Sequence, residues 1–332
     1  MYTFIHASYV RWTVILGFVI AGVWFMTGLF GKSYSGPVLP LSEQEAVIRD
    51  NLEQHVSMLA GHIGERNVWH PAALESAAGY IKDGLEVSGY RVKEQSFKSQ
   101  NLVLGNIEAE LAGGEFRREI VIVGAHYDSV IGSPGANDNA SGVAALLEIA
   151  RLLSGTRLER TVRFVAFANE EPPFFYTDEM GSRVYAARSR ERGERIVAMM
   201  ALETVGYYTN AKGSQRYPFP LGLFYPDRGN FVGFVGNLVS GRLVFQAIKA
   251  FRQSTRFPSQ GATLPGWVVG VHWSDHWSFW KEGYPALMVT DTALFRYPYY
   301  HSSADTPEKL DYTSMARVVD GLGRVVAELA SN

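Results

Sequence analysis

Acidic and histidine side chains stand directly after apolar runs of this sequence. The run "EIVIVGA" is followed by His126, Asp128 and Asp138, and the run "TVRFVAFAN" is followed by Glu170 and Glu171. Burying such groups without partners is costly. Because such groups recur where apolar runs end, we expect them to form a functional site.

Two more apolar runs end in the same way. Glu203 follows "VAMMAL", and "ALMVTD" precedes a loop that carries His301. Ligands of open α/β sheets gather at the carboxyl ends of the strands. We therefore expect all these side chains to meet at one edge of a sheet.

The residue types favour a zinc site. The chain has no cysteine, so a transition metal must be held by His, Asp and Glu. Two imidazoles and three carboxylates are too many for one tetrahedral ion; they are His126, Asp138, Glu171, Glu203 and His301. Two zinc ions about 3.5–4 Å apart with a water between them, sharing Asp138, would use all five. The two cations would also neutralise the acidic cluster.

Two carboxylates are left over from this ligand set. Asp128 stands two residues after His126, on the same side of an extended chain, where it can accept the other imidazole N–H. Glu170 points differently from its neighbour Glu171, so it can act as general base on the bound water.

The elements that must position these residues alternate along the chain. Strand-like runs cover 101–111, 119–125, 161–168, 195–202 and 285–291, and helical runs cover 42–59, 71–87, 141–153, 181–190, 241–251 and 307–330. This alternation predicts an α/β fold with a mostly parallel mixed sheet covered by helices on both faces.

The N-terminus carries a different signal. The stretch from Trp12 to Phe30 contains no charged residue, close to the roughly 20 residues needed to span a bilayer. Signal peptides have shorter apolar regions, of about 7–15 residues, and a small-x-small cleavage site, which "LFGKSYSG" lacks. We expect residues 1–31 to be an uncleaved single-pass anchor with a transmembrane helix at about 12–30, and the rest of the chain to lie on the extracytoplasmic side, periplasmic or extracellular.

The rest of the chain is predicted to form a linker and one large domain. Residues 32–41 are rich in Pro, Gly and Ser, and a capping box at Ser42 opens a helix, so the domain covers 42–332. The formal net charge is -2, which gives no basic excess for nucleic acid.

The ordered motifs resemble a known family. His-x-Asp at 126–128, Asn-Asp-Asn-Ala-Ser-Gly at 137–142, Glu-Glu at 170–171 and the late His301 look like the two-zinc aminopeptidases of peptidase family M28. The resemblance runs roughly from Ser42 to the C-terminus and implies the zinc aminopeptidase (phosphorylase/hydrolase-like) fold. It also implies a cis peptide bond between Asp138 and Asn139.

The resemblance assigns roles to the residues. It implies His126 and Glu203 on one zinc ion, Glu171 and His301 on the other, Asp138 shared between them and Glu170 as the base. Many family members have aspartate at the position of Glu203. The segment "HWSDHWS" resembles the family's Ser-Asp-His segment, which makes Asp275 a supporting group.

Further residues are candidates for contact with a substrate. The Tyr300 hydroxyl can donate to a developing oxyanion, with plain packing as the alternative. An aromatic loop after Glu171 is expected to overhang the site, and its Asp178 and Glu179 could contact a substrate amine.

The expected activity is hydrolysis of the N-terminal residue of peptides that have a free amino terminus. One alternative is a single-zinc enzyme similar to glutaminyl cyclases. Another is a membrane-anchored binding protein on the same scaffold without catalysis, for which lost ligands would be expected.

Overall fold

The computed structural model describes residues 11–14, 17, 21–22 and 31–331. Its strands are β1 (Val92–Ser99), β2 (Leu102–Leu111), β3 (Phe116–His126), β4 (Arg160–Phe167), β5 (Arg195–Glu203), β6 (Val232–Gly236), β7 (Ser259–Thr263) and β8 (Ala286–Thr290). Its helices are α2 (Glu43–Val56), α3 (Pro71–Val87), α4 (Gly142–Leu153), α5 (Gly181–Glu191), α6 (Gly241–Ser254), α7 (His276–Lys281) and α8 (Tyr312–Ser331). Short π-helical turns follow α2 and precede α4.

All the strands form one mixed sheet in the order β1-β2-β4-β3-β5-β8-β6-β7. The central pairs β4/β3, β3/β5 and β5/β8 are parallel, as is β6/β7 at one edge. The pairs β1/β2, β2/β4 and β8/β6 are antiparallel. This confirms the expected α/β fold with a mostly parallel mixed sheet.

The central strand β3 shows why the sheet is covered on both faces. Successive side chains of a strand point to opposite faces. Val121 and Val123 join a core that includes α4 and α8, whereas Ile120 and Ile122 join a second core. Both faces are apolar, as expected of a strand buried on both sides.

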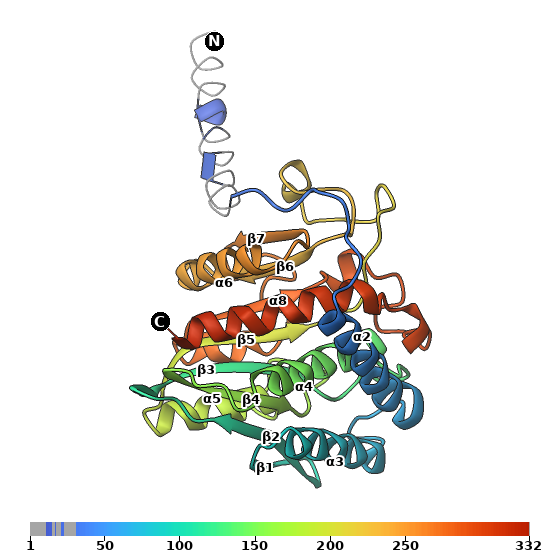
Figure 1. Cartoon of the computed structure of the whole chain (residues 1–332), viewed down its shortest axis with the longest axis vertical. Helices are drawn as coiled ribbons and strands as arrows, with labels where there is room; N and C mark the ends of the chain where they lie inside the picture. The colour runs from blue at the N-terminus through green and yellow to red at the C-terminus, as the bar shows by residue number, and fades with distance from the viewer. Residues whose placement is uncertain (1–10, 15–16, 18–20, 23–30, 332) are drawn as a thin grey trace, which may run out of the picture.

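Helices divide between these two faces. α8 packs against α2, α4 and α6 on one face, and α5 packs against α7 on the other. Figure 1 shows α4, α6 and α8 lying side by side across the sheet, with α2 near the ends of the central strands.

Several short strands and one short helix have no clear signal in the sequence. β6 and β7 have five residues each and contain glycine, β1 is an edge strand with exposed charged residues, and α7 has only six residues. Each is too short or too polar to show a clear period. The last helix begins at Tyr312, not at Pro307, because Pro307–Lys309 form a separate 3-10 turn.

The predicted membrane anchor stays a prediction. Most of residues 12–30 lie outside the described residues. In the part of the chain that the structure describes, no helix has the length and apolar character needed to cross a membrane.

A tight loop between β3 and α4 carries Asp138. Gly135 opens it with φ of 63°, a left-handed conformation that suits glycine, and the Asp138–Asn139 bond is cis as the resemblance implied. At Gly142 a Cβ atom would lie 2.4 Å from the Leu202 carbonyl oxygen, so glycine lets α4 approach β5.

Arg66 holds this loop in place through hydrogen bonds to backbone carbonyl oxygens. Its guanidinium is fully buried and donates to the carbonyl oxygens of Tyr127 at 2.7 Å, Pro134 at 2.6 Å and Gly135 at 2.9 Å. Burial lowers the pKa of Arg66 only to about 10, so it stays charged at neutral pH. One side chain thus ties the segment after β3 to the turn before Asp138.

Replacing Arg66 should destabilise the protein. Arg66→Met removes the charged donor of several hydrogen bonds to buried carbonyl oxygens, and we expect the free energy of unfolding to fall by about 3 kcal/mol or more. Chemical denaturation in detergent would measure the loss. Arg49→Met, at a half-exposed surface arginine, is the control, and equal stability of both variants would contradict the role given to Arg66.

Candidate metal centre

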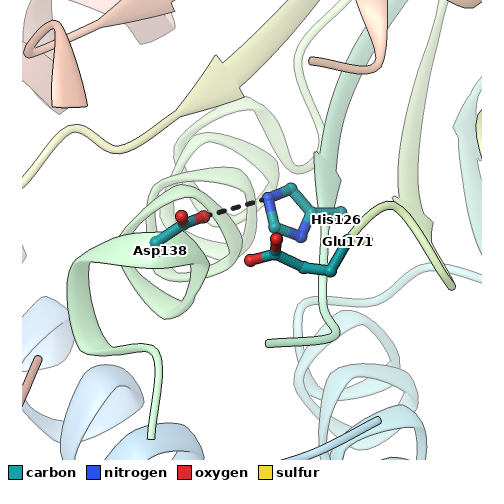
Figure 2. Close-up of side chains that lie close together, drawn as sticks. All are labelled: His126, Asp138 and Glu171. Atoms are coloured by element: carbon teal, nitrogen blue, oxygen red, sulfur yellow. Dashed lines mark ion pairs between the residues drawn. The ribbon is translucent and has the colours of Figure 1, made fainter. Parts of the chain in front are cut away.

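The predicted ligands converge at the carboxyl ends of the central strands. His126 is the last residue of β3, Glu203 is the last residue of β5, and Glu171 follows β4 within a few residues. Figure 2 shows His126, Asp138 and Glu171 facing one another, and one ligand atom from each lies within 4.8 Å of the other two. Every predicted ligand therefore reaches the same place.

Asp138 stands between the two histidines. Its Oδ1 lies 3.3 Å from His126 Nε2, and its Oδ2 lies 3.1 Å from His301 Nε2. His126 Nε2 is also 3.4 Å from Glu203 Oε2, and His301 Nε2 is 3.3 Å from Glu171 Oε2. The cluster thus divides into two sets, each with one histidine and one glutamate, joined by the two oxygens of one aspartate.

The cluster concentrates buried negative charge. Burial and Asp138 raise the pKa of Glu171 to about 7, and burial raises that of Glu170 well above its ordinary value. Burial alone would lower the pKa of His126, but Glu170 and Glu203 raise it well above its usual range. The raised pKa values of the two glutamates and of His126 follow from the burial of several carboxylates close together.

The donor set fits zinc. Two ligands bound about 2.0–2.1 Å from a tetrahedral ion lie about 3.3–3.4 Å apart, and the four nitrogen–oxygen distances within the two sets are 3.1 to 3.4 Å. Glu171 Oε1 is buried without a hydrogen-bond partner. Such an atom needs a cation or a donor.

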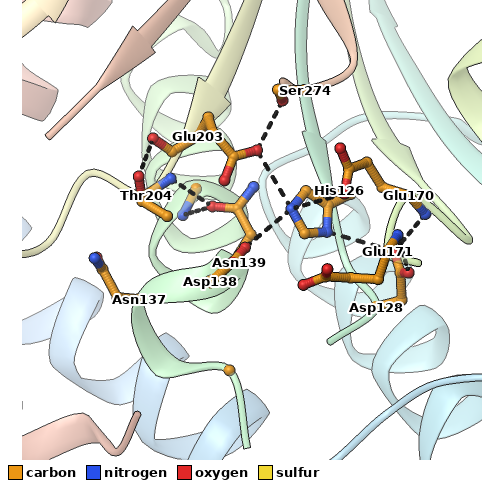
Figure 3. Close-up of polar contacts among 12 residues, drawn as sticks. His126, Asp128, Asn137, Asp138, Asn139, Glu170, Glu171, Glu203, Thr204 and Ser274 are labelled. Carbon is orange, nitrogen blue, oxygen red and sulfur yellow. Dashed lines mark hydrogen bonds and ion pairs between the residues drawn. The ribbon is translucent and has the colours of Figure 1, made fainter. Parts of the chain in front are cut away.

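Asp128 lies beside the cluster and holds the backbone of the next strand end. Its two oxygens accept from the N–H groups of Glu170 and Glu171, each at 3.0 Å (Figure 3). Its Oδ1 is also 3.4 Å from His126 Nδ1. Its predicted action on the imidazole stays a prediction, while its hold on the Glu-Glu pair is an additional role.

The long side chain of Glu203 has its own support. Ser274 Oγ donates to Glu203 Oε2 at 2.7 Å. The neighbouring Asp275 is fully buried, and burial raises its pKa to about 7. Within the described residues Asp275 forms no ion pair with a ligand, so its supporting role stays a prediction; Ser274 was not predicted.

Two more acids that sequence reasoning missed position the Asp138 loop. Asp305 accepts from the N–H groups of Asn137 at 2.8 Å and Asp138 at 3.1 Å, and from the Tyr297 hydroxyl at 2.7 Å. Asp291 accepts from the Asn137 side-chain amide at 2.9 Å. The end of β8 was the available signal for Asp291, and nothing in the local pattern marks Asp305.

The aromatic loop after Glu171 does overhang the site. Phe175 and Tyr176 line the pocket at the metal centre, here called the site pocket, which is also lined by Trp273, Tyr300 and the predicted ligands Asp138, Glu171, Glu203 and His301. The Tyr300 ring stacks on His301 with 3.8 Å between ring centroids, and its role at an oxyanion stays a prediction.

The acidic residues of this aromatic loop do not face the site. Glu179 Oε2 accepts from Ser99 Oγ at 2.8 Å and from the Gln100 N–H at 3.0 Å, because the loop turns back toward β1. Neither Asp178 nor Glu179 lines the pocket. The expectation that they contact a substrate amine is therefore wrong.

A second, apolar pocket adjoins the site. It has about 820 Å³ of empty space, part of it open to solvent, and shares Glu203, Tyr300 and Trp273 with the site pocket. Its other walls come from β6, β7, β8 and the segment between β5 and β6, and they are mostly apolar and aromatic. A side chain held at the metal centre can therefore extend into it.

Solved structures with this fold have more than one activity. A zinc aminopeptidase of Bacillus subtilis superposes with a TM-score of 0.67 at 17% identity, over 89% of this chain and 97% of that one. A glutaminyl cyclase of Fimbriiglobus ruber superposes with a TM-score of 0.63 at 20% identity, over 89% of this chain and 98% of that one. These likenesses show the fold alone.

Sequence comparison is more specific. An uncharacterized protein of Escherichia coli K12, YfbL, is 39% identical over 93% of this chain and 97% of its own length. Residues 106–326, which include every predicted ligand, match the description "Peptidase family M28". The chain belongs to peptidase family M28.

Proposed function

We propose that this protein is a two-zinc aminopeptidase that removes bulky apolar residues from the N-terminus of peptides. The observation that carries this proposal is the position of Asp138, whose two oxygens face two different histidines at 3.3 and 3.1 Å. A single-ion site would not need both oxygens. The complete ligand set also argues against a scaffold that has lost catalysis.

Each residue of the centre has a role in this proposal. His126 and Glu203 would hold one zinc ion, Glu171 and His301 the other, and Asp138 both. Bound zinc would acidify a water molecule and polarise the scissile carbonyl. Glu170 lies at the pocket wall, with Oε2 3.9 Å from His126 Nε2, where it would accept the water's proton and return it to the leaving amine.

The charge of the pockets favours an amino terminus over a carboxyl terminus. The residues lining the site pocket and the apolar pocket include Asp138, Glu170, Glu171 and Glu203 but no lysine or arginine. A C-terminal carboxylate is ordinarily bound by a cationic side chain. A protonated amine instead suits carboxylate neighbours.

The wild-type preference tests the role of the apolar pocket. We expect kcat/KM for peptides that begin with Leu or Phe to exceed that for Ala by at least about tenfold, and N-acetylated peptides to resist cleavage. Ala262 lies on β7 in the pocket wall, so Ala262→Phe should reduce the preference by about tenfold. Ala211→Phe, at an exposed position outside the pocket, is the control. Equal rates on free and acetylated peptides would refute the aminopeptidase assignment.

Glu170→Gln should keep the metal and lose turnover. The amide has the same shape but cannot accept the proton, so kcat should fall by about 10²–10⁴-fold. Zinc content measured on the same sample separates this effect from loss of the site. Glu53→Gln, at an exposed helical position, should match wild type, and an active Glu170→Gln variant would sink the assignment of the base.

Metal content separates the peptidase from a cyclase-like enzyme. We expect two zinc ions per chain by elemental analysis, and one in His301→Ala, because His126 and Glu203 are untouched. His62→Ala, at an exposed histidine, should keep both ions. A single ion in the wild type, together with release of ammonia from peptides that begin with glutamine, would favour the cyclase alternative.

A further inference from the structure

The segment between β5 and β6 carries an exposed apolar tip. Residues 217–224, "YPFPLGLF", are here called the apolar loop. Phe219 is 91% exposed and Leu223 is 74% exposed. Other residues of the loop are held in place, since the Tyr217 hydroxyl donates to the Pro226 carbonyl oxygen at 2.7 Å and Leu221 is buried. The exposed side chains therefore project from a supported loop.

A second exposed aromatic residue adjoins the apolar loop. Leu221 shares a small core with Leu264 and Val271, and Val268 packs against the same core. Trp267, next to Val268, is 80% exposed. Soluble domains rarely expose several large apolar side chains together unless the patch contacts something.

The residues directly after the N-terminal apolar stretch contact the domain at α6 and the start of β7. The Gly31 carbonyl oxygen accepts from Arg252 Nη1 at 2.8 Å, and Ser33 Oγ accepts from the Ser259 N–H at 2.9 Å. The hydroxyl of Tyr225, which directly follows the apolar loop, donates to the carbonyl oxygen of Gly261 at 2.7 Å, two residues along β7 from Ser259. The chain is thus fixed to the β7 edge of the sheet within three residues of Phe30, and Figure 1 shows this linker running past the loops between β5 and β6.

Basic side chains accompany the apolar ones. The segment 206–231 contains Lys212, Arg216 and Arg228 against a single acid, Asp227, and all four are exposed. Lys32, directly after the apolar stretch, is exposed as well. Aromatic and apolar side chains flanked by lysine and arginine are typical of surfaces that lie in the headgroup region of an anionic bilayer.

We propose that the apolar loop inserts into the surface of the bilayer that would hold the anchor predicted for residues 12–30, with Phe219 and Leu223 below the headgroups. This inference rests on the predicted anchor and is independent of the proposed peptidase activity. Pro218 and Leu221 of the loop also line the apolar pocket. This wall of the apolar pocket then lies beside the membrane surface.

The absence of cysteine makes the test direct. Single variants Phe219→Cys and Leu223→Cys of the full chain carry a nitroxide label and are reconstituted in vesicles of phosphatidylcholine with about one third phosphatidylglycerol, a composition that supplies anionic headgroups. Collision rates with oxygen, which partitions into lipid, and with a water-soluble nickel chelate give the depth of each label. Val87→Cys is the matched control, since Val87 is 89% exposed and ends α3, which packs near the opposite edge of the sheet.

Labels at 219 and 223 should show a several-fold higher ratio of oxygen to nickel collisions than the label at 87. The same ratio at all three positions would overturn the proposal, as would failure of the full chain to enter the vesicles. Strong spin–spin broadening between labels on different molecules would assign the patch to a second copy of the chain and would overturn it too. Zinc content and peptidase activity do not enter any of these outcomes.

Discussion

Repulsion among buried carboxylates is the constraint on which this structure depends. Asp138, Glu170, Glu171 and Glu203 are all nearly inaccessible to solvent, and only His126 and His301 offset them within the cluster. Burying ionised carboxylates so close together costs much free energy unless cations bind between them. The sheet brings them together because its central strands are parallel and end at one edge. The architecture therefore concentrates buried negative charge, which bound divalent cations would neutralise.

Two acids around the centre, Asp291 and Asp305, differ from Glu171 within it in their hydrogen bonds. Asp305 and Asp291 accept from backbone N–H groups and neutral side chains, so their charges are compensated without a metal. Glu171 Oε1 has no such donor. A buried carboxylate oxygen that already accepts hydrogen bonds is compensated by them, whereas one without a donor, such as Glu171 Oε1, is available to a cation. This distinction is visible only in three dimensions.

The predictable part of the site follows from strand periodicity. β3, β4 and β5 are long, apolar runs, so their ends and the residues His126, Glu170 and Glu203 could be placed from the sequence. Ser274 and Asp305 could not, because their partners lie far away in the chain and no local pattern marks a long-range hydrogen bond. The short strands β6 and β7 form part of the wall of the apolar pocket. They could not be predicted, because five residues are too few to show an alternation of apolar and polar side chains.

The orientation of Asp138 shows why the ligand set cannot be separated from the fold. Its own N–H is held by Asp305, the preceding turn is held by Arg66, and the amide of the following Asn139 donates to the Leu202 carbonyl oxygen at the end of β5 at 2.8 Å. These three supports come from distant parts of the chain. Together they hold the backbone that carries Asp138, whose two carboxylate oxygens face the two histidines. Groups that are remote in the sequence therefore set the geometry of the residue that both halves of the ligand set share.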